Sequence, residues 1–156
     1  ADARVLVDYA RVQSQVNRVS YNERIDLQTL VKKICDYKQT YTQYGGVRPF
    51  GTALLVAGMD EDGAHLYETD PSGAFMAYKA GAIGMDREEV QEVFDHEYRD
   101  DLTLEEGIKL ALKGLKRASE EGLNSESLEV AVIREEENFT KLGKEKIKEY
   151  LESLEE

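Results

Sequence analysis

The spacing of apolar residues switches between two periods along this chain, and the order of the switches restricts the folds open to it. Steps of three and four residues place apolar side chains on one face of a helix, whereas alternation or a short apolar run between turn signals indicates a strand. The pattern predicts a helix pair at 1–45, strands at 51–84, a helix pair at 86–122, strands at 127–142 and a helix at 144–156. Strands that are adjacent in sequence, with segregated helices, indicate α+β layers. No repeat or Pro-rich linker interrupts them, so we expect one domain over 1–156.

The first helix is expected to run to about Val19, with apolar residues at alternating steps of four and three. This face comprises Val5, Tyr9, Val12, Val16 and Val19. Asp26 suits the N-cap of a second helix, with Ile25 and Leu30 placed as its hydrophobic staple. The expected buried stripe of that helix comprises Leu27, Leu30, Val31, Ile34, Tyr37 and Tyr41. The short break between the two helices predicts an antiparallel helical hairpin.

A glycine-rich segment, TQYGGVRPFG, follows at 42–51. Gly45 and Gly46 are expected to end the helix in a left-handed C-cap. Pro49 biases Arg48 towards extended geometry, which suits the start of a strand. A ligand site is the alternative for this segment, and we favour the structural role.

Three strands are expected after Gly51, and they form an antiparallel meander. They comprise residues 52–57, 64–69 and 74–83, with a turn at 60–63. Asp70-Pro71-Ser72-Gly73 matches a type I β-turn position by position, with Asp first, Pro second and Gly fourth. We therefore assign structural roles to Gly51, Asp70, Pro71 and Gly73.

Two capping boxes are expected to start the second helix pair, Asp86 with Glu89 and Thr103 with Glu106. Met85 and Val90 would staple the first of these helices. The inward faces are expected to comprise Val90, Val93, Phe94 and Tyr98, then Leu104, Ile108, Ala111, Leu115 and Ala118, with Gly122 as C-cap. The remaining elements are a strand with Leu128, Val130 and Val132, a short strand near Phe139, and a last helix with Ile147, Tyr150, Leu151 and Leu154.

The composition excludes several classes of partner. A net charge of −12 over 156 residues repels phosphate backbones, so nucleic acid is not an expected partner. No apolar run reaches the roughly 18 residues of a membrane span, so no membrane partner is expected. The single cysteine, Cys35, leaves no internal disulfide, and we expect a cytoplasmic protein.

No residue set predicts catalysis, a cofactor or a metal site. His65 and His96 are interpreted as surface or packing residues. Cys35 lies at the edge of a buried helical stripe, where a thiol has no route to a reactive thiolate. Turns and helix caps explain the carboxylates at 60–62 and 100–101, and the first group lacks the ligand spacing of a calcium loop.

Five motifs, in this order and spacing, resemble a known family. They are ADARVLVDYAR, YTQYGGVRPFG, LYETDPSGA, YKAGAIG and EYRDDL. The chain closely resembles α subunits of the archaeal 20S proteasome along its length, less closely after about Arg134. The resemblance implies a partial sandwich of the N-terminal-nucleophile-hydrolase type, α/β/β/α, with antiparallel sheets flanked by helical layers.

The resemblance also implies a non-catalytic role. Seven such subunits form each outer ring of the protease, where they scaffold the β ring, gate the passage of substrates and dock a regulatory ATPase. The implied partners are therefore other α subunits, β subunits and, for the full-length subunit, the ATPase. Two alternatives stay open: an active N-terminal-nucleophile peptidase of the same fold, for which Ala1 offers no nucleophile, and a free-standing acidic adaptor domain.

In this family the first motif lies well inside the chain, so we expect a piece truncated at its N-terminus, without the gate segment and the preceding strands. Open sheet edges would then lead the isolated chain to self-associate. The family places the helical hairpin between the rings. Arg4, Arg11 and Gln15 are therefore the residues expected to contact β subunits.

Overall fold

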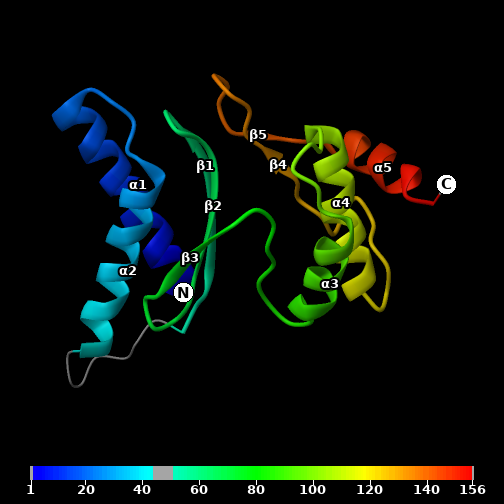
Figure 1. Ribbon diagram of the computed structural model, residues 1–156, viewed down its shortest axis with the longest axis horizontal. Helices are drawn as coiled ribbons and strands as arrows, with labels where there is room; N and C mark the ends of the chain where they lie inside the picture. The colour runs from blue at the N-terminus through cyan, green and yellow to red at the C-terminus, as the bar shows by residue number, and fades with distance from the viewer. Residues whose placement is uncertain (1, 44–50, 156) are drawn as a thin grey trace. The chain divides into compact units, whose positions relative to one another are not determined.

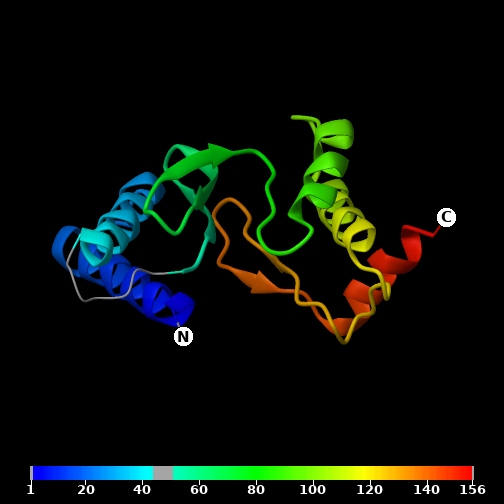
Figure 2. The ribbon, with the colours of Figure 1, turned by 90° about the horizontal axis from the view of Figure 1, so that it is seen from below.

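The computed structural model describes residues 2–43, without the side chains of 41–43, and residues 51–155. Helices alternate with small antiparallel sheets in the order that the apolar periodicity predicts, so the fold class is α+β (Figures 1 and 2). The chain divides into two compact units, Ala1–Lys79 and Ala80–Glu156. The expectation of one domain over 1–156 stays a prediction.

The first unit consists of a helical hairpin and a three-stranded meander. Its elements are α1 (Asp2–Tyr21), α2 (Leu27–Gln43), β1 (Leu54–Asp60), β2 (Gly63–Thr69) and β3 (Phe75–Tyr78). The strand order is β1-β2-β3, and α2 contacts all three strands (Figure 1). The core comprises Leu6, Leu27, Leu30, Val31, Ile34, Cys35 and Tyr67, with Leu54, Val56 and Phe75 packed against it. The stripe predicted on α2 is confirmed from Leu27 to Ile34, with Tyr37 half-buried; Tyr41 lies outside the described side chains.

The apolar face predicted for α1 is wrong. The valines of that face are exposed: Val5 by 45%, Val12 by 51%, Val16 by 51% and Val19 by 87%. The helix instead buries the side one residue further round, about 100° away, which carries Leu6 and Ala10. Tyr9 belongs to both sides and stacks on Tyr37 of α2, with ring centroids 4.4 Å apart. The buried side is selected by tertiary packing, because α1 contacts α2 through Leu6, Tyr9 and Ala10 and leaves the valines exposed.

The meander follows the predicted turns, but its last strand is shorter than expected. β1 pairs with β2 from Leu54↔Thr69 to Asp60↔Gly63, and β2 pairs with β3 only as far as Leu66↔Tyr78. The strand predicted to reach Ile83 therefore ends at Tyr78. Pairing stops there because Leu66 is the last β2 residue with a partner on β3, and residues 79–83 have no strand partner among the described residues.

The second unit holds α3 (Arg87–Glu97), α4 (Leu104–Ala118), β4 (Ala131–Val132), β5 (Thr140–Lys141) and α5 (Lys144–Ser153). β4 and β5 pair antiparallel; β4 holds only the end of the strand predicted with Leu128, Val130 and Val132, and β5 follows directly after Phe139, where a short strand is predicted. The predicted face of α3 is confirmed for Val90, Val93 and Phe94, with Tyr98 half-buried. Leu128, Val132 and Ile147 are buried with Ile108 and Leu112, and Val130, Tyr150, Leu151 and Leu154 pack against them.

One of the two predicted capping boxes is confirmed. The Thr103 hydroxyl accepts the Glu106 N–H at 3.2 Å, and the Glu106 carboxylate accepts the Thr103 N–H at 3.1 Å. Asp86 makes no such bond, because its backbone is left-handed with φ +60°, whereas an N-cap needs extended geometry. Met85 is almost fully exposed, so the expected staple is absent as well.

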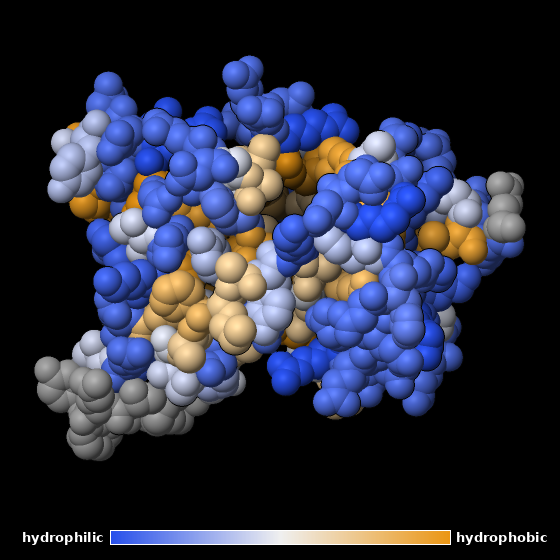
Figure 3. Space-filling view, in the orientation of Figure 1, coloured by the Kyte–Doolittle hydropathy of each residue, from blue (hydrophilic) through white to orange (hydrophobic). Residues whose placement is uncertain are grey.

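The stripe predicted on α4 is wrong in part. Ile108 is buried, but Leu104, Ala111 and Leu115 are exposed, and Leu112 is buried in their place. The helix is covered on a second side by α3, which approaches so closely that a Cβ at Gly114 would lie 2.7 Å from Val90 Cγ1. The helix also ends earlier than expected, at Ala118 with Ser119 as C-cap, so the left-handed Gly122 belongs to the loop that follows. On the face shown in Figure 3, hydrophobic residues reach the surface among hydrophilic ones.

Candidate interaction surface on the helical hairpin

The outer surface of α1 combines a row of valines with a row of arginines. Arg4, Arg11 and Arg18 are exposed and follow one another at seven-residue steps. Seven residues are nearly two helical turns, so the three side chains lie along one line of the helix. Gln15 is also exposed, while Asp8 forms an exposed ion pair with Arg11 at 3.7 Å. Exposed pairs of this kind contribute little stability. Arg4, Arg11 and Gln15, which are predicted to contact β subunits, are thus all exposed to solvent.

Several bonds fix the other side of α1. Besides the Tyr9–Tyr37 stack, Lys33 Nζ donates to Gln13 Oε1 at 3.3 Å. The N–H of Gly51 donates to Asp2 Oδ2 at 3.0 Å, which joins the start of α1 to the segment before β1. These contacts fix the orientation of α1 on α2, so that its valine and arginine side chains face outwards.

A buried lysine of α2 connects the hairpin to the sheet. The Lys38 side chain is completely buried, and its ammonium donates to Thr52 O at 2.8 Å, Thr69 Oγ1 at 2.8 Å and Asp70 O at 3.0 Å. Burial lowers the pKa of Lys38, which the nearby Cys35 and Asp70 oppose. Sequence reasoning missed this residue, although it lies seven residues after Val31 and four after Ile34, on the buried side of the helix.

The predicted turn at 70–73 is confirmed, and it rests on α2. The Gly73 N–H donates to Asp70 O at 3.1 Å, and Asp70 Oδ1 accepts from the Ser72 hydroxyl at 2.6 Å and the Ala74 N–H at 3.0 Å. The Ser72 hydroxyl, followed by the backbone N–H groups, holds the pKa of Asp70 below its usual value although burial opposes this. Pro71 is exposed. Gly73 is left-handed at φ +91°, and a Cβ there would lie 2.9 Å from a carbonyl oxygen of α2.

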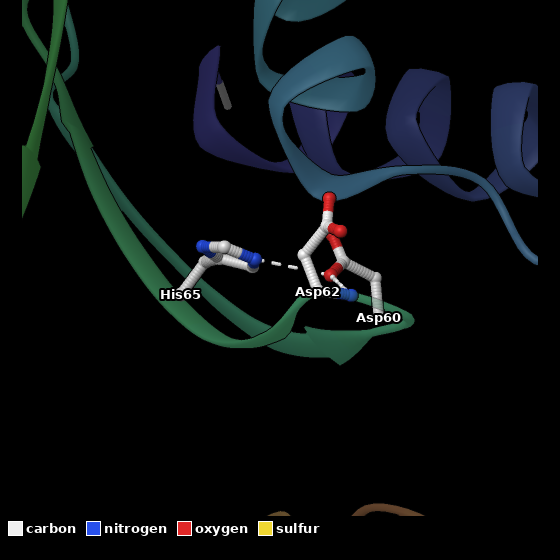
Figure 4. Close-up of side chains that lie close together, drawn as sticks. All are labelled: Asp60, Asp62 and His65. Atoms are coloured by element: carbon white, nitrogen blue, oxygen red, sulfur yellow. Dashed lines mark hydrogen bonds and ion pairs between the residues drawn. The ribbon is translucent and has the colours of Figure 1, made fainter.

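The carboxylate of Asp60, at the tip of the β1–β2 hairpin, caps α2. Asp60 Oδ2 accepts the Leu27 N–H at 3.0 Å, while Oδ1 accepts the Asp62 N–H at 2.9 Å and lies 3.0 Å from His65 Nε2 (Figure 4). Burial raises the pKa of Asp60, but the two N–H groups and His65 outweigh it and leave the pKa below its usual value. Asp26 adds the predicted N-cap, since its Oδ2 accepts the Thr29 N–H at 3.0 Å.

Asp60, Asp62 and His65 place possible ligand atoms within 4.8 Å of one another. Three donors already use the Asp60 oxygens. The positive end of the α2 dipole also points at this carboxylate and disfavours a cation there. The cluster is therefore accounted for as a helix cap.

Two nucleophilic side chains of the first unit, those of Cys35 and Thr69, are buried away from solvent. Cys35 is buried, and burial raises the pKa of its thiol to about 11, so it stays protonated. The Thr69 hydroxyl lies against Lys38, but both side chains are fully buried and the ammonium has no free lone pair. His96 is exposed on α3.

Four of the predicted structural residues cannot be placed, because Gly45, Gly46, Arg48 and Pro49 lie outside the described residues. Over the part of the chain that the structure describes, no helix is both long and apolar enough to cross a membrane.

Comparison with known proteins places this architecture in a family. The sequence model described as "Proteasome subunit" matches residues 1–133. Proteins named proteasome subunit alpha are 53% identical over 155 residues in Methanosarcina acetivorans, 55% over 154 in Methanopyrus kandleri and 50% over 155 in Methanocaldococcus jannaschii. Each alignment covers 99% of this chain, which spans 63%, 62% and 59% of the respective relatives. With the family match extending over most of its length, the chain belongs to the proteasome subunit family.

Proposed function

We propose that this chain is part of a non-catalytic α subunit in the outer ring of a 20S proteasome core, in the cytoplasm. One observation carries the proposal: identity of 50–55% along nearly the whole chain to archaeal proteins that are named as alpha subunits. In such a ring the subunit would assemble with six further α subunits, support the β ring and help to admit substrates. A regulatory ATPase would bind the complete subunit.

The buried positions of Cys35 and Thr69 agree with a structural role for these two residues. Their thiol and hydroxyl are inaccessible to a substrate. An active peptidase of the same fold is the alternative. Incubating the purified chain with fluorogenic peptides in the absence of any β subunit separates the two, because turnover under these conditions would contradict the non-catalytic role.

We further propose that the hairpin and meander of the first unit are one helical layer and part of one sheet of an α/β/β/α sandwich. The family relationship supports this, as does the packing of α2 against one face of the meander. The outer side of α1 would then be available to a neighbouring subunit.

Co-assembly with the β subunit tests the proposed role directly. Arg4→Glu with Arg11→Glu, or Gln15→Glu alone, should reduce the fraction of chain found in complexes with co-expressed β subunits on native gels. Far-UV circular dichroism should stay unchanged, because all three side chains are exposed. If the chain never enters a complex with α or β subunits, the free-standing adaptor is the better account.

A further inference from the structure

The tip of the β1–β2 hairpin carries the single Asp-Gly pair of the sequence, Asp62-Gly63, and the sequence has no Asn-Gly pair. An aspartate side chain can react with the peptide nitrogen of the residue that follows it. Glycine obstructs this approach least, because it has no Cβ. The least protected dipeptide of this kind therefore lies at a loop of only two residues, Glu61 and Asp62, between β1 and β2.

The fold leaves this pair accessible. Asp62 is exposed and Gly63 is half-buried. Gly63 has a φ of +110°, and apart from its chain neighbours nothing in the described part of the chain lies within 4 Å of the place where a Cβ would be. The last pair of the ladder is Asp60↔Gly63, and pairs at the end of a hairpin open at little cost in free energy. Such opening frees the Gly63 nitrogen to approach the Asp62 carboxyl group.

Asn124 shows what a protected side chain of this kind looks like. It is followed by a small residue, Ser125, and its amide could react in the same way. Its side-chain oxygen, however, accepts the N–H groups of Glu126 and Ser127, both at 2.9 Å. These two bonds hold the side chain in one conformation. The Asp62 carboxylate, in contrast, makes no hydrogen bond or ion pair with another described residue.

We propose that Asp62-Gly63 is a site of spontaneous isoaspartate formation in the folded chain. The Gly63 nitrogen attacks Cγ of the Asp62 carboxyl group, a C–N bond forms, and the hydroxyl leaves as water with the proton that the nitrogen gives up. A solvent water molecule then opens the resulting succinimide. Cleavage at the former side-chain carbonyl restores aspartate, whereas cleavage at the main-chain carbonyl leaves a chain that runs through Cβ and carries a free α-carboxylate. The reaction needs no enzyme and no partner subunit, so it goes beyond the proposed function.

The product alters the cap of α2. Isoaspartate places its Cβ methylene in the main chain, which disturbs the Asp60↔Gly63 pair and the bond from the Asp62 N–H to Asp60 Oδ1 (Figure 4). The other oxygen of the same carboxylate, Oδ2, accepts the Leu27 N–H at the start of α2. Modified chains should therefore exchange the Leu27 amide hydrogen faster than unmodified ones.

Ageing the purified, folded chain at neutral pH tests the proposal. The probe is an isoaspartyl methyltransferase, which transfers a methyl group from S-adenosylmethionine to the free α-carboxylate, and peptide mapping locates the label. Label should accumulate at Asp62 at a rate within about tenfold of that in a synthetic peptide of residues 57–68, because opening the end of the hairpin costs little.

Two variants of Asp62 test the chemistry in opposite directions. Asp62→Glu should abolish the label at this site, since the longer side chain would have to close a less favourable six-membered ring. Asp62→Asn should form isoaspartate faster, because a neutral amide, unlike a carboxylate, carries no negative charge that repels the attacking nitrogen. Asp101 is the matched control in the same sample: it is also exposed, but the bulky Leu102 follows it, so it should stay unlabelled.

Several outcomes would overturn the proposal: no label at Asp62, equal label at Asp62 and Asp101, or an unchanged rate in Asp62→Asn. So would a rate in the folded chain more than about a hundredfold below that of the peptide, since the ladder would then hold the Gly63 nitrogen in place. Unchanged exchange of the Leu27 amide in modified chains would disprove the link to α2. Because no readout uses a proteasome subunit, failure here leaves the proposed function untouched.

Discussion

Lys38 Nζ lies 2.8 Å from Thr69 Oγ1, and both side chains are completely buried. The ammonium joins α2 to the end of β2, to Thr52 just before β1 and to the turn at 70–73; among the described residues its acceptors are one hydroxyl and two backbone carbonyls. A buried charge of this kind is tolerated only when its donors are satisfied. The residue therefore helps to hold α2 on the sheet, together with the apolar core that they share.

Replacing Lys38 tests this connection. Lys38→Met keeps the aliphatic stem but leaves the buried Thr69 hydroxyl and two part-buried carbonyls without their donor, and we expect a loss of about 1–3 kcal/mol in the free energy of opening of α2. Native-state hydrogen exchange of α2 amides measures it. Lys33→Met is the control on the same helix, because that side chain is only half-buried, and it should change the value by less than about 0.5 kcal/mol. An unchanged exchange rate in Lys38→Met would contradict the role assigned to the ammonium.

The Cys35 thiol makes the first unit sensitive to alkaline pH. Its pKa is raised from 9.0 to about 11, so between these values the unfolded chain loses a proton that the folded chain keeps. Stability contributed by the protonated thiol is therefore complete below about pH 9 and is lost as the pH rises towards 11. Cys35→Ala should flatten this part of the stability–pH profile. The measurement is urea unfolding from pH 8 to 11, and parallel profiles for the two proteins would refute the assignment.

The sequence predicts local features well because their signals are local. The Thr103–Glu106 box and the turn from Asp70 to Gly73 each depend on residues no more than three positions apart, and the bonds are present. The side of α1 that faces inwards, by contrast, cannot be predicted from local sequence signals. Its valine side is as periodic as the side with Leu6, and only the tertiary contact with α2 selects between them.

The candidate surface could be predicted only in part for the same reason. Arg4 and Arg11 were expected to be exposed and are so. Val5, Val12, Val16 and Val19 were assigned to the core but are exposed, because helical periodicity marks an apolar face without saying what covers it. Lys38 was missed, because a lysine on a helix is usually solvated and its three oxygen partners come from segments 14 to 32 residues away.

Gly73 should be far less replaceable than Gly63. Both have positive φ, +91° and +110°, so any side chain is strained at either site. A Cβ at Gly73 would also lie 2.7 Å from Gln39 Cγ and 2.9 Å from Cys35 O, whereas nothing lies within 4 Å at Gly63. Gly63→Ala should cost about 1 kcal/mol. Gly73→Ala should cost at least about twice as much, as measured by thermal unfolding, and equal costs would show that the turn is not pressed against α2.

Asp60 should stabilise the start of α2 in a pH-dependent way. Asp60→Ala removes the acceptor of the Leu27 N–H, and the loss of such a cap costs about 0.5–2 kcal/mol at neutral pH. Because the folded pKa lies below the usual 3.8, the stabilisation is complete above that value and disappears as the pH falls through the lower folded pKa. The wild type and Asp60→Ala should therefore differ at pH 7 and converge as the pH falls through the lowered folded pKa of Asp60. Asp26→Ala, which removes the other cap of the same helix, provides the comparison at each pH. Exchange rates of the α2 amides report both variants, and a difference for Asp60→Ala that persists unchanged at pH 2 would mean that its carboxylate does not act through its charge.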